Sequence, residues 1–167
     1  MNLYILRHGL AVERGAAGYA RDSERPLTPK GERKVWRIAE AMGAMELSFD
    51  LILSSPYVRA RETAEIVVQA FKAGKKLEFS NHLTPEGSAQ ELLGFLRDHN
   101  ARPENVLLVG HEPYLSELIS LFLGGDSRVM VNLKKGGLCK LEVESLRPGH
   151  CASLAWLLTP KLMALMS

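Results

Sequence analysis

Residues 2–9 read NLYILRHG, an apolar run that ends abruptly in the polar tripeptide Arg7-His8-Gly9. The run Leu3–Leu6 does not alternate with polar residues, which is typical of a strand buried on both faces of a parallel sheet. Two later runs, LIL at 51–53 and VLLV at 106–109, have the same character. The sequence therefore predicts three buried strands, each followed directly by polar residues.

Amphipathic helices are predicted between these strands. Apolar residues recur three and four positions apart in residues 35–42, 60–71 and 115–122, and a further helix is expected around 88–98. Strands that alternate with helices form right-handed βαβ units. We therefore expect an α/β fold, a three-layer α/β/α sandwich with a mostly parallel central sheet.

The end of the chain follows a different pattern. Residues 138–143 and 152–158 have the character of strands and are joined through Arg147-Pro148-Gly149, which predicts an antiparallel pair at one edge of the sheet. The sequence contains no internal repeat and no linker-like stretch. We expect residues 1–167 to form a single domain.

Composition narrows the class of protein. The 167 residues include 21 Lys and Arg against 19 Asp and Glu, a formal net charge of +2, which argues against nucleic acid as the main partner. No run of about 18 apolar residues is present, so no membrane span is expected. The first residues do not resemble a signal peptide, and Cys139 and Cys151 fit no redox or zinc motif. We expect a cytoplasmic protein with two buried thiols.

The polar residues that follow the three strands form the candidate site. They are Arg7-His8-Gly9, residues 54–59 (SSPYVR) and residues 110–113 (GHEP). Ligands of open α/β sheets bind at the carboxyl ends of the strands, so two histidines and two arginines are predicted to meet there. Clustered cations repel one another in an empty site, which favours an anionic ligand. Arginine forks match the geometry of phosphate.

The second of these segments predicts how Arg59 reaches the site. Ser54 or Ser55 is expected to cap a helix whose first turn contains Pro56. Side chains lean toward the N-terminus of a helix, so Arg59 is expected to reach back to the strand ends, whereas Arg61 points elsewhere. The free N–H groups of the helix N-terminus also favour an anion.

Several common phosphate and metal motifs are absent from the sequence. It contains neither the G-x-x-x-x-G-K-[ST] loop of nucleoside triphosphate sites nor the G-x-G-x-x-G loop of dinucleotide sites. No acidic cluster and no H-x-x-x-H pair accompanies the strand ends. We therefore expect no cofactor and a metal-free reaction in which arginines neutralise the phosphate charge.

Four blocks in register resemble the histidine phosphatase superfamily, whose members have the phosphoglycerate mutase-like fold. Within it, they resemble the small bacterial phosphohistidine phosphatases of the SixA type. The blocks are Arg7-His8-Gly9; Arg25-Pro26-Leu27-Thr28 with Gly31; Ser54-Ser55-Pro56 with Arg59-Ala60 and Thr63-Ala64; and Val109-Gly110-His111-Glu112-Pro113. Their order and spacing agree from residue 2 to about 124.

The resemblance implies a two-step reaction. Neutral His8 attacks phosphorus through one ring nitrogen, and water then hydrolyses the phosphohistidine intermediate. The other nitrogen of His8 is expected to donate to a backbone carbonyl or an acceptor side chain. Arg7, Arg25, Arg59 and His111 are expected to bind the phosphoryl oxygens. Nearby cations lower the pKa of His8 and keep it neutral, and they oppose protonation of His111, whose charge without phosphate stays open.

The proton donor to the leaving group is less well defined. Larger members of the superfamily use a carboxylate, and Glu86, in the segment 83–87 (LTPEG), occupies the corresponding stretch. The alternative is that Glu86 is a solvated turn residue beside Pro and Gly. Glu112 replaces the glycine of many relatives, and we interpret it as a charge that caps the following helix.

These features predict a phosphatase that acts on phosphohistidine in proteins. An alternative within the superfamily is hydrolysis of small sugar or acid phosphates, a class of phosphomonoester. Mutase activity is disfavoured because the chain is too short to build a lid that excludes water. An alternative of another class is a non-catalytic module that binds phosphate or a phosphorylated partner.

Overall fold

The computed structural model describes residues 1–147 and 149–166. Within these residues the strands are β1 (Asn2–Arg7), β2 (Leu51–Ser54), β3 (Leu77–Phe79), β4 (Asn105–Gly110), β5 (Leu138–Val143) and β6 (Ala152–Leu158). The α-helices are α1 (Pro29–Ala44), α2 (Val58–Phe71), α3 (Ala89–Asp98), α4 (Tyr114–Gly124) and α5 (Pro160–Met163). Short 3-10 turns are η1 (Asp22–Glu24), η2 (Gly74–Lys76) and η3 (Asn81–Leu83).

The strands form one mixed sheet in the order β3-β2-β4-β1-β5-β6. The first four of these strands run parallel, whereas β5 is antiparallel to both β1 and β6. The predicted parallel centre and antiparallel edge pair are therefore confirmed. The predicted connection between β5 and β6 includes Pro148, which lies outside the described residues.

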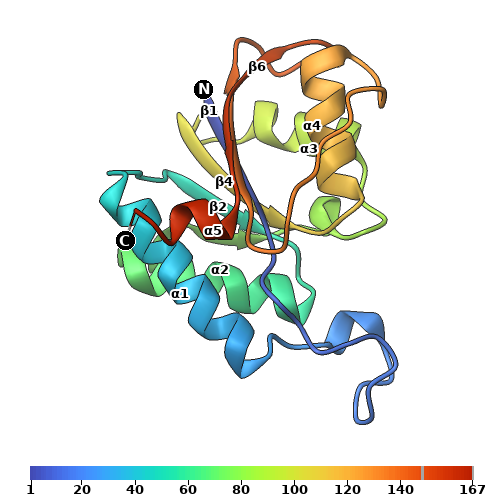
Figure 1. The fold of residues 1–167 in the computed structure, drawn as a ribbon. Coiled ribbons are helices and arrows are strands. Elements are labelled where there is room, and N and C mark those ends of the chain that lie inside the picture. The colour runs from blue at the N-terminus through green and yellow to red at the C-terminus, as the bar shows by residue number, and fades with distance from the viewer. Residues whose placement is uncertain (148, 167) are drawn as a thin grey trace.

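Helices cover both faces of this sheet (Figure 1). Alternate residues of β1 show the two cores: Leu3 and Ile5 belong to the cluster shared with α3 and α4, and Tyr4 and Leu6 belong to the cluster shared with α1 and α2. Burial on both faces explains why the central strands are continuously apolar. The three-layer α/β/α sandwich predicted from the sequence is the observed fold.

The edge strand β3 is the part of the sheet that the sequence did not predict. Strand β3 has three residues, too few to show a period, and Phe79 at its end is about half exposed.

Both cysteines, Cys139 and Cys151, are buried free thiols, as expected. Among the described residues, no helix is long and apolar enough to cross a membrane.

Strand register brings the three polar segments together at one end of the sheet, where the parallel strands finish. Arg7 at the end of β1 pairs with Gly110 of β4, and Ser54 at the end of β2 pairs with Val109. The pairing continues one step further, because the backbone N–H of His8 donates to Gly110 O and that of Ser55 to Val109 O. The residues that follow the strands therefore start from neighbouring, fixed points.

Candidate active site

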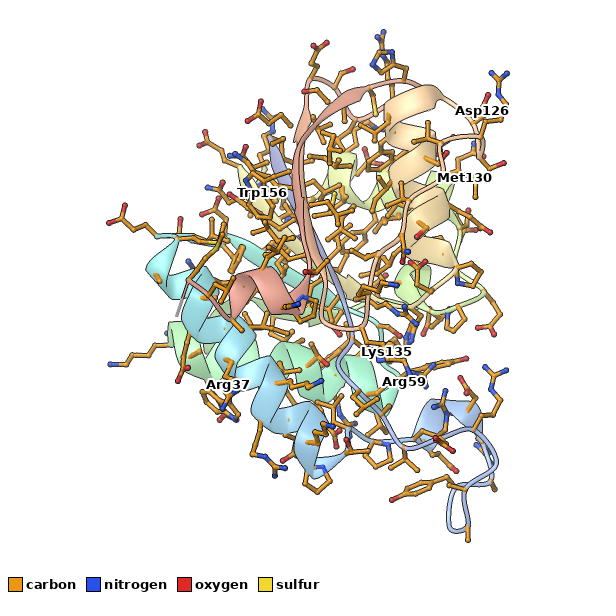
Figure 2. The ribbon with its side chains drawn as sticks, in the orientation of Figure 1. Arg37, Arg59, Asp126, Met130, Lys135 and Trp156 are labelled. Atoms are coloured by element: carbon orange, nitrogen blue, oxygen red, sulfur yellow. The ribbon has the colours of Figure 1, made fainter. Side chains whose placement is uncertain are left out.

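A crevice of about 350 Å³ lies at the carboxyl ends of β1, β2 and β4. It is lined by Arg7, His8, Leu10, Ala11, Glu13, Arg14, Arg25, Arg59, His111, Glu112 and Lys135. Five of the six candidate site residues are therefore brought together; the sixth, Glu86, is not among the lining residues. Arg59 and Lys135 mark the crevice in Figure 2, where they lie close together at the end of the sheet.

His8 is almost fully buried, and both of its ring nitrogens are hydrogen bonded. Nδ1 lies 2.7 Å from Gly9 O, and Arg59 Nε donates to Nε2 over 3.2 Å. Because a guanidinium N–H only donates, Nε2 presents its lone pair and Nδ1 carries the proton that Gly9 O accepts. This matches the expected contact with a backbone carbonyl and leaves the lone pair on Nε2.

Burial lowers the pKa of His8 to about 2, with smaller contributions from His111, Arg59 and Arg7. His8 is therefore neutral at pH 7, as a nucleophile must be. The sequence argument named the neighbouring cations as a cause of this lowering. Removal from water is instead the larger cause, because the strand end places His8 beneath the arginines and out of solvent.

Arg59 reaches the crevice from the first turn of α2, as predicted, and only 3% of its surface is exposed. Its Nη1 donates to the backbone carbonyl of Asp22 over 2.7 Å and its Nη2 to Asp22 Oδ2 over 2.9 Å. With Nε on His8, every nitrogen of this guanidinium holds a protein partner. Arg61, in contrast, forms an exposed ion pair with Glu65, as the helix geometry predicted.

The predicted cap of α2 is wrong. The helix begins at Val58 with Tyr57 at the N-cap, and no side chain caps it. Ser54 and Ser55 are otherwise engaged: Ser54 Oγ donates to Ser55 O, and Ser55 Oγ accepts from the backbone N–H of Tyr57. These contacts form a turn before the helix, so Pro56 lies ahead of the first turn.

Thr63 connects the segment that carries His8 to this helix. The Gly9 N–H donates to Thr63 Oγ1 over 3.1 Å, and Thr63 Oγ1 donates to the carbonyl of Arg59 one turn earlier over 2.7 Å. The end of β1 and the start of α2 are thereby joined through a buried hydroxyl. This contact fixes His8 relative to Arg59.

Arg7 reaches the crevice from the end of β1, and Arg25 reaches it from a loop. Arg7 Nη1 donates to Leu133 O over 2.9 Å in the segment before β5, while its buried Nε has no partner in the described part of the chain. Arg25 lies on the loop between β1 and α1, and its Nη1 donates to Val12 O over 2.6 Å. The path of this loop therefore brings Arg25 to the crevice.

Asp22 is the functional residue that the sequence analysis missed. Its Oδ1 accepts from Arg25 Nε at 2.9 Å and Nη2 at 2.6 Å, and also from the exposed Arg14 at 3.2 Å. Burial alone would raise the pKa of Asp22, but hydrogen bonds and charges from Arg25 and Arg59 outweigh it and lower the pKa to about 2. Asp22 therefore carries a full negative charge between two site arginines.

His111 faces His8 across the crevice, with 5.1 Å between the ring centroids. Its Nε2 lies 2.8 Å from Ser55 Oγ, and its buried Nδ1 has no partner among the described residues. Burial, followed by the charge of Arg59, lowers the pKa of His111 to about 3. His111 is therefore neutral at pH 7 without a ligand, which resolves the charge state left open above.

The two candidate glutamates lie in different surroundings. Glu86 is exposed and accepts a hydrogen bond from Tyr57 Oη over 3.1 Å, and the Tyr57 ring contacts that of His111. Glu112 lines the crevice and accepts from Ser116 through both the backbone N–H and the hydroxyl. The contact to the first turn of α4 agrees with the interpretation of Glu112 as a capping charge.

A larger hollow, of about 770 Å³, lies elsewhere on the molecule, between β3 and α3. Its charged lining is acidic and includes Glu78, Glu91 and Asp98, with no arginine. Such a surface repels a phosphoryl group, so the smaller crevice is the candidate site despite its size. In the described residues, no group of three or more His, Cys, Asp or Glu side chains is placed to hold a metal ion.

The arrangement suits chemistry on a phosphoryl group. It combines a neutral imidazole whose lone pair accepts from Arg59, the arginines Arg7, Arg25 and Arg59, and a second neutral imidazole around one small space. Preorganised positive charge stabilises the negative charge that spreads over phosphoryl oxygens in a transition state. A fixed nucleophilic nitrogen allows covalent transfer.

Comparisons with known proteins agree with this geometry. A family model described as histidine phosphatase superfamily (branch 1) matches residues 3–86. An uncharacterised protein of Picosynechococcus sp. is 38% identical over 161 residues, 95% of this chain and 96% of that protein. The phosphohistidine phosphatase SixA homologue of Haemophilus influenzae is 33% identical over 134 residues, 74% of this chain and 78% of that protein.

Solved structures give the same result. The protein histidine phosphatase SixA complexed with tungstate superposes with a TM-score of 0.81 and 25% identity, over 96% of this chain and 98% of that chain. This coverage extends well past residues 3–86, which the family model matches. The chain belongs to the histidine phosphatase superfamily, and it is SixA-like in both sequence and fold.

Proposed function

We propose that the protein is a phosphohistidine phosphatase that removes phosphate from histidine side chains of other proteins through a covalent intermediate on His8. The observation that carries this proposal is the state of His8. Its Nδ1–H is held by Gly9 O, so its Nε2 lone pair lies in a crevice lined by Arg7, Arg25 and Arg59. A neutral, oriented imidazole among fixed cations is the requirement for attack on phosphorus.

The reaction has two balanced steps. In the first, the Nε2 lone pair of His8 forms a bond to phosphorus, the phosphorus–nitrogen bond of the substrate histidine breaks, and its electron pair returns to the leaving imidazole, which takes up a proton. In the second, water attacks the phosphoryl group, loses a proton and displaces His8, which regains its Nε2 lone pair. Inorganic phosphate is released, and the enzyme returns to its starting state.

Arg59 must change partners in this scheme. In the empty site, its Nε–H donates to the same Nε2 that attacks phosphorus, at 3.2 Å. A phosphoryl oxygen that enters the crevice offers a charged and therefore stronger acceptor for that N–H. We propose that this exchange releases the lone pair only when a phosphoryl group is present.

Phosphohistidine is favoured over a phosphomonoester by the leaving group. An imidazole nitrogen is a far weaker base than an alkoxide, so its departure depends less on a strong acid at the site. The candidate acid Glu86 lies outside the crevice lining, and Asp22 is ionised. The names of the SixA relatives support the same substrate class. Donation of a proton by Glu86 stays a prediction.

The test is phosphate release by wild type and His8→Ala, with chelator and no added metal, from a phosphohistidine protein and a panel of small phosphomonoesters. His150→Ala is the matched control, because His150 is exposed. We expect His8→Ala to lower the rate of phosphate release at least about 10³-fold, because it removes the proposed nucleophile. His150→Ala should release phosphate at the wild-type rate.

The same experiment separates the alternatives. Faster release from small phosphomonoesters than from the phosphoprotein would replace the proposed substrate with a sugar or acid phosphate. No release from any substrate, together with binding of inorganic phosphate, would leave a phosphate-binding module. Either result would overturn the proposed function.

A further inference from the structure

Ser55 is fully buried beneath the crevice, and its hydroxyl makes two contacts that together restrict where its proton lies. Its Oγ accepts from the backbone N–H of Tyr57 over 3.3 Å and lies 2.8 Å from His111 Nε2. Over the described parts of the chain these are the hydrogen bonds of Ser55 Oγ. A backbone N–H only donates, so the Ser55 proton has one acceptor within reach, which is His111 Nε2.

The two neutral tautomers of His111 differ in how many buried groups they leave unpaired. If the proton is on Nδ1, Ser55 donates to Nε2 and one group, Nδ1–H, lacks a partner. If the proton is on Nε2, two groups lack a partner: the Ser55 hydroxyl proton and the Nδ1 lone pair. A buried donor or acceptor without a partner costs about 1–3 kcal/mol, and the second tautomer leaves one more such group than the first. The first tautomer is therefore the more stable.

An anionic ligand increases this difference. His111 lines the crevice with Arg7, Arg25 and Arg59, and Nδ1 is its one ring nitrogen without a protein partner. An N–H at that position donates to a phosphoryl oxygen, whereas a lone pair repels it. The first tautomer then has every group satisfied, and the second does not.

We propose that Ser55 is a positioning residue that holds neutral His111 as the Nδ1–H tautomer, so that Nδ1–H donates to a phosphoryl oxygen in the crevice. The tautomer follows from the contacts of Ser55 alone, and the identity of the acceptor rests on the proposed function. Ser55 thus does for His111 what the Gly9 carbonyl does for His8. The two imidazoles carry opposite roles, one presenting a lone pair and the other a proton.

The test is the ring ¹⁵N NMR spectrum of histidine-labelled protein at pH 7, with His111 assigned by its loss in His111→Asn. We expect wild type to show a protonated Nδ1 and a bare Nε2 at His111. Ser55→Ala should lose this fixed pattern and bind inorganic phosphate roughly tenfold more weakly, because the competent tautomer is then only partly populated. Ser55→Cys, which retains a weak donor of similar shape, should lie between the two.

Ser54→Ala is the matched control, because Ser54 is equally buried and its hydroxyl bonds to Ser55 O rather than to His111. It should leave the His111 spectrum and phosphate affinity unchanged. A protonated Nε2 in wild type would overturn the inference without any variant, as would an unchanged spectrum in folded Ser55→Ala. If wild type hydrolyses no substrate yet shows these spectra and binding changes, the proposed function fails and the role of Ser55 stands.

Discussion

Replacing Asp22 by Asn should destabilise the protein in a pH-dependent way. The arginine contacts lower the pKa of Asp22 from its ordinary 3.8 to about 2. Since one pKa unit corresponds to about 1.4 kcal/mol, this lowering is equivalent to about 2.4 kcal/mol of stability at pH 7. Asp22 is 29% exposed, so solvent screening reduces the expected loss in Asp22→Asn to roughly 1–2 kcal/mol.

The sign of the pH effect follows from the lowered pKa. The contribution of Asp22 to the free energy of unfolding is complete above the pKa that Asp22 has in the unfolded state. It is lost as the pH falls through the pKa of Asp22 in the folded state, so roughly half of it is lost at pH 3. Urea unfolding at pH 7, 4 and 3 measures it, with Asp98→Asn as control because its ion pair with Arg97 is exposed. The control should change stability by less than about 0.5 kcal/mol. A loss in Asp22→Asn that stays constant from pH 7 to 3 would refute the electrostatic role of Asp22.

Three further predictions follow from the site and its supports. Because the pKa of His8 is lowered to about 2 and that of His111 to about 3, both rings should stay neutral at pH 5 in NMR titrations. In the unfolded state both histidines bind a proton below about pH 6.5, so the free energy of unfolding should fall from pH 7 to 5 by up to about 2 kcal/mol for each ring. A free energy of unfolding that does not change between pH 7 and 5 would contradict this. Glu86→Gln should slow phosphomonoester hydrolysis about 10²-fold and leave phosphohistidine hydrolysis unchanged if Glu86 donates the proton, and equal effects on both substrates exclude that role. Gly31→Ala should cost at least about 3 kcal/mol in thermal unfolding, because its new Cβ overlaps the backbone carbonyl of the β1–α1 loop, whereas Gly43→Ala meets open space and should stabilise α1 by about 0.5–1 kcal/mol.

The centre of the fold was predictable because its strands are buried on both faces. Burial by helices on each side requires continuous apolar runs such as Leu3–Leu6, and such a run identifies the strand in the sequence. The ends of these strands carry His8 and His111, so position alone indicated the site. Strand β3 has no such signature, because it lies at the edge and is only partly covered.

Asp22 and Ser55 escaped prediction because their roles depend on contacts distant in sequence. Asp22 meets Arg59 across 37 positions and Ser55 meets His111 across 56. One local signal was present for Asp22, since an acid three residues before Arg25 suits an i, i+3 ion pair. For Ser55 the local pattern favoured a helix cap, whereas in the structure its hydroxyl is hydrogen bonded to the buried imidazole of His111.

The position of Asp22 explains how a cluster of cations survives without a ligand. Arg25 and Arg59 would repel each other in an empty crevice, and Asp22 accepts hydrogen bonds from both. Glu112, which also lines the crevice, acts electrostatically on Arg7. These carboxylates reduce the repulsion between the arginines, and Asp22 holds Arg25 and Arg59 in place before a phosphoryl group binds. In the proposed reaction these carboxylates also offset part of the attraction for phosphate, which favours release of the product. A site built from arginines alone would bind phosphate more tightly and release it more slowly.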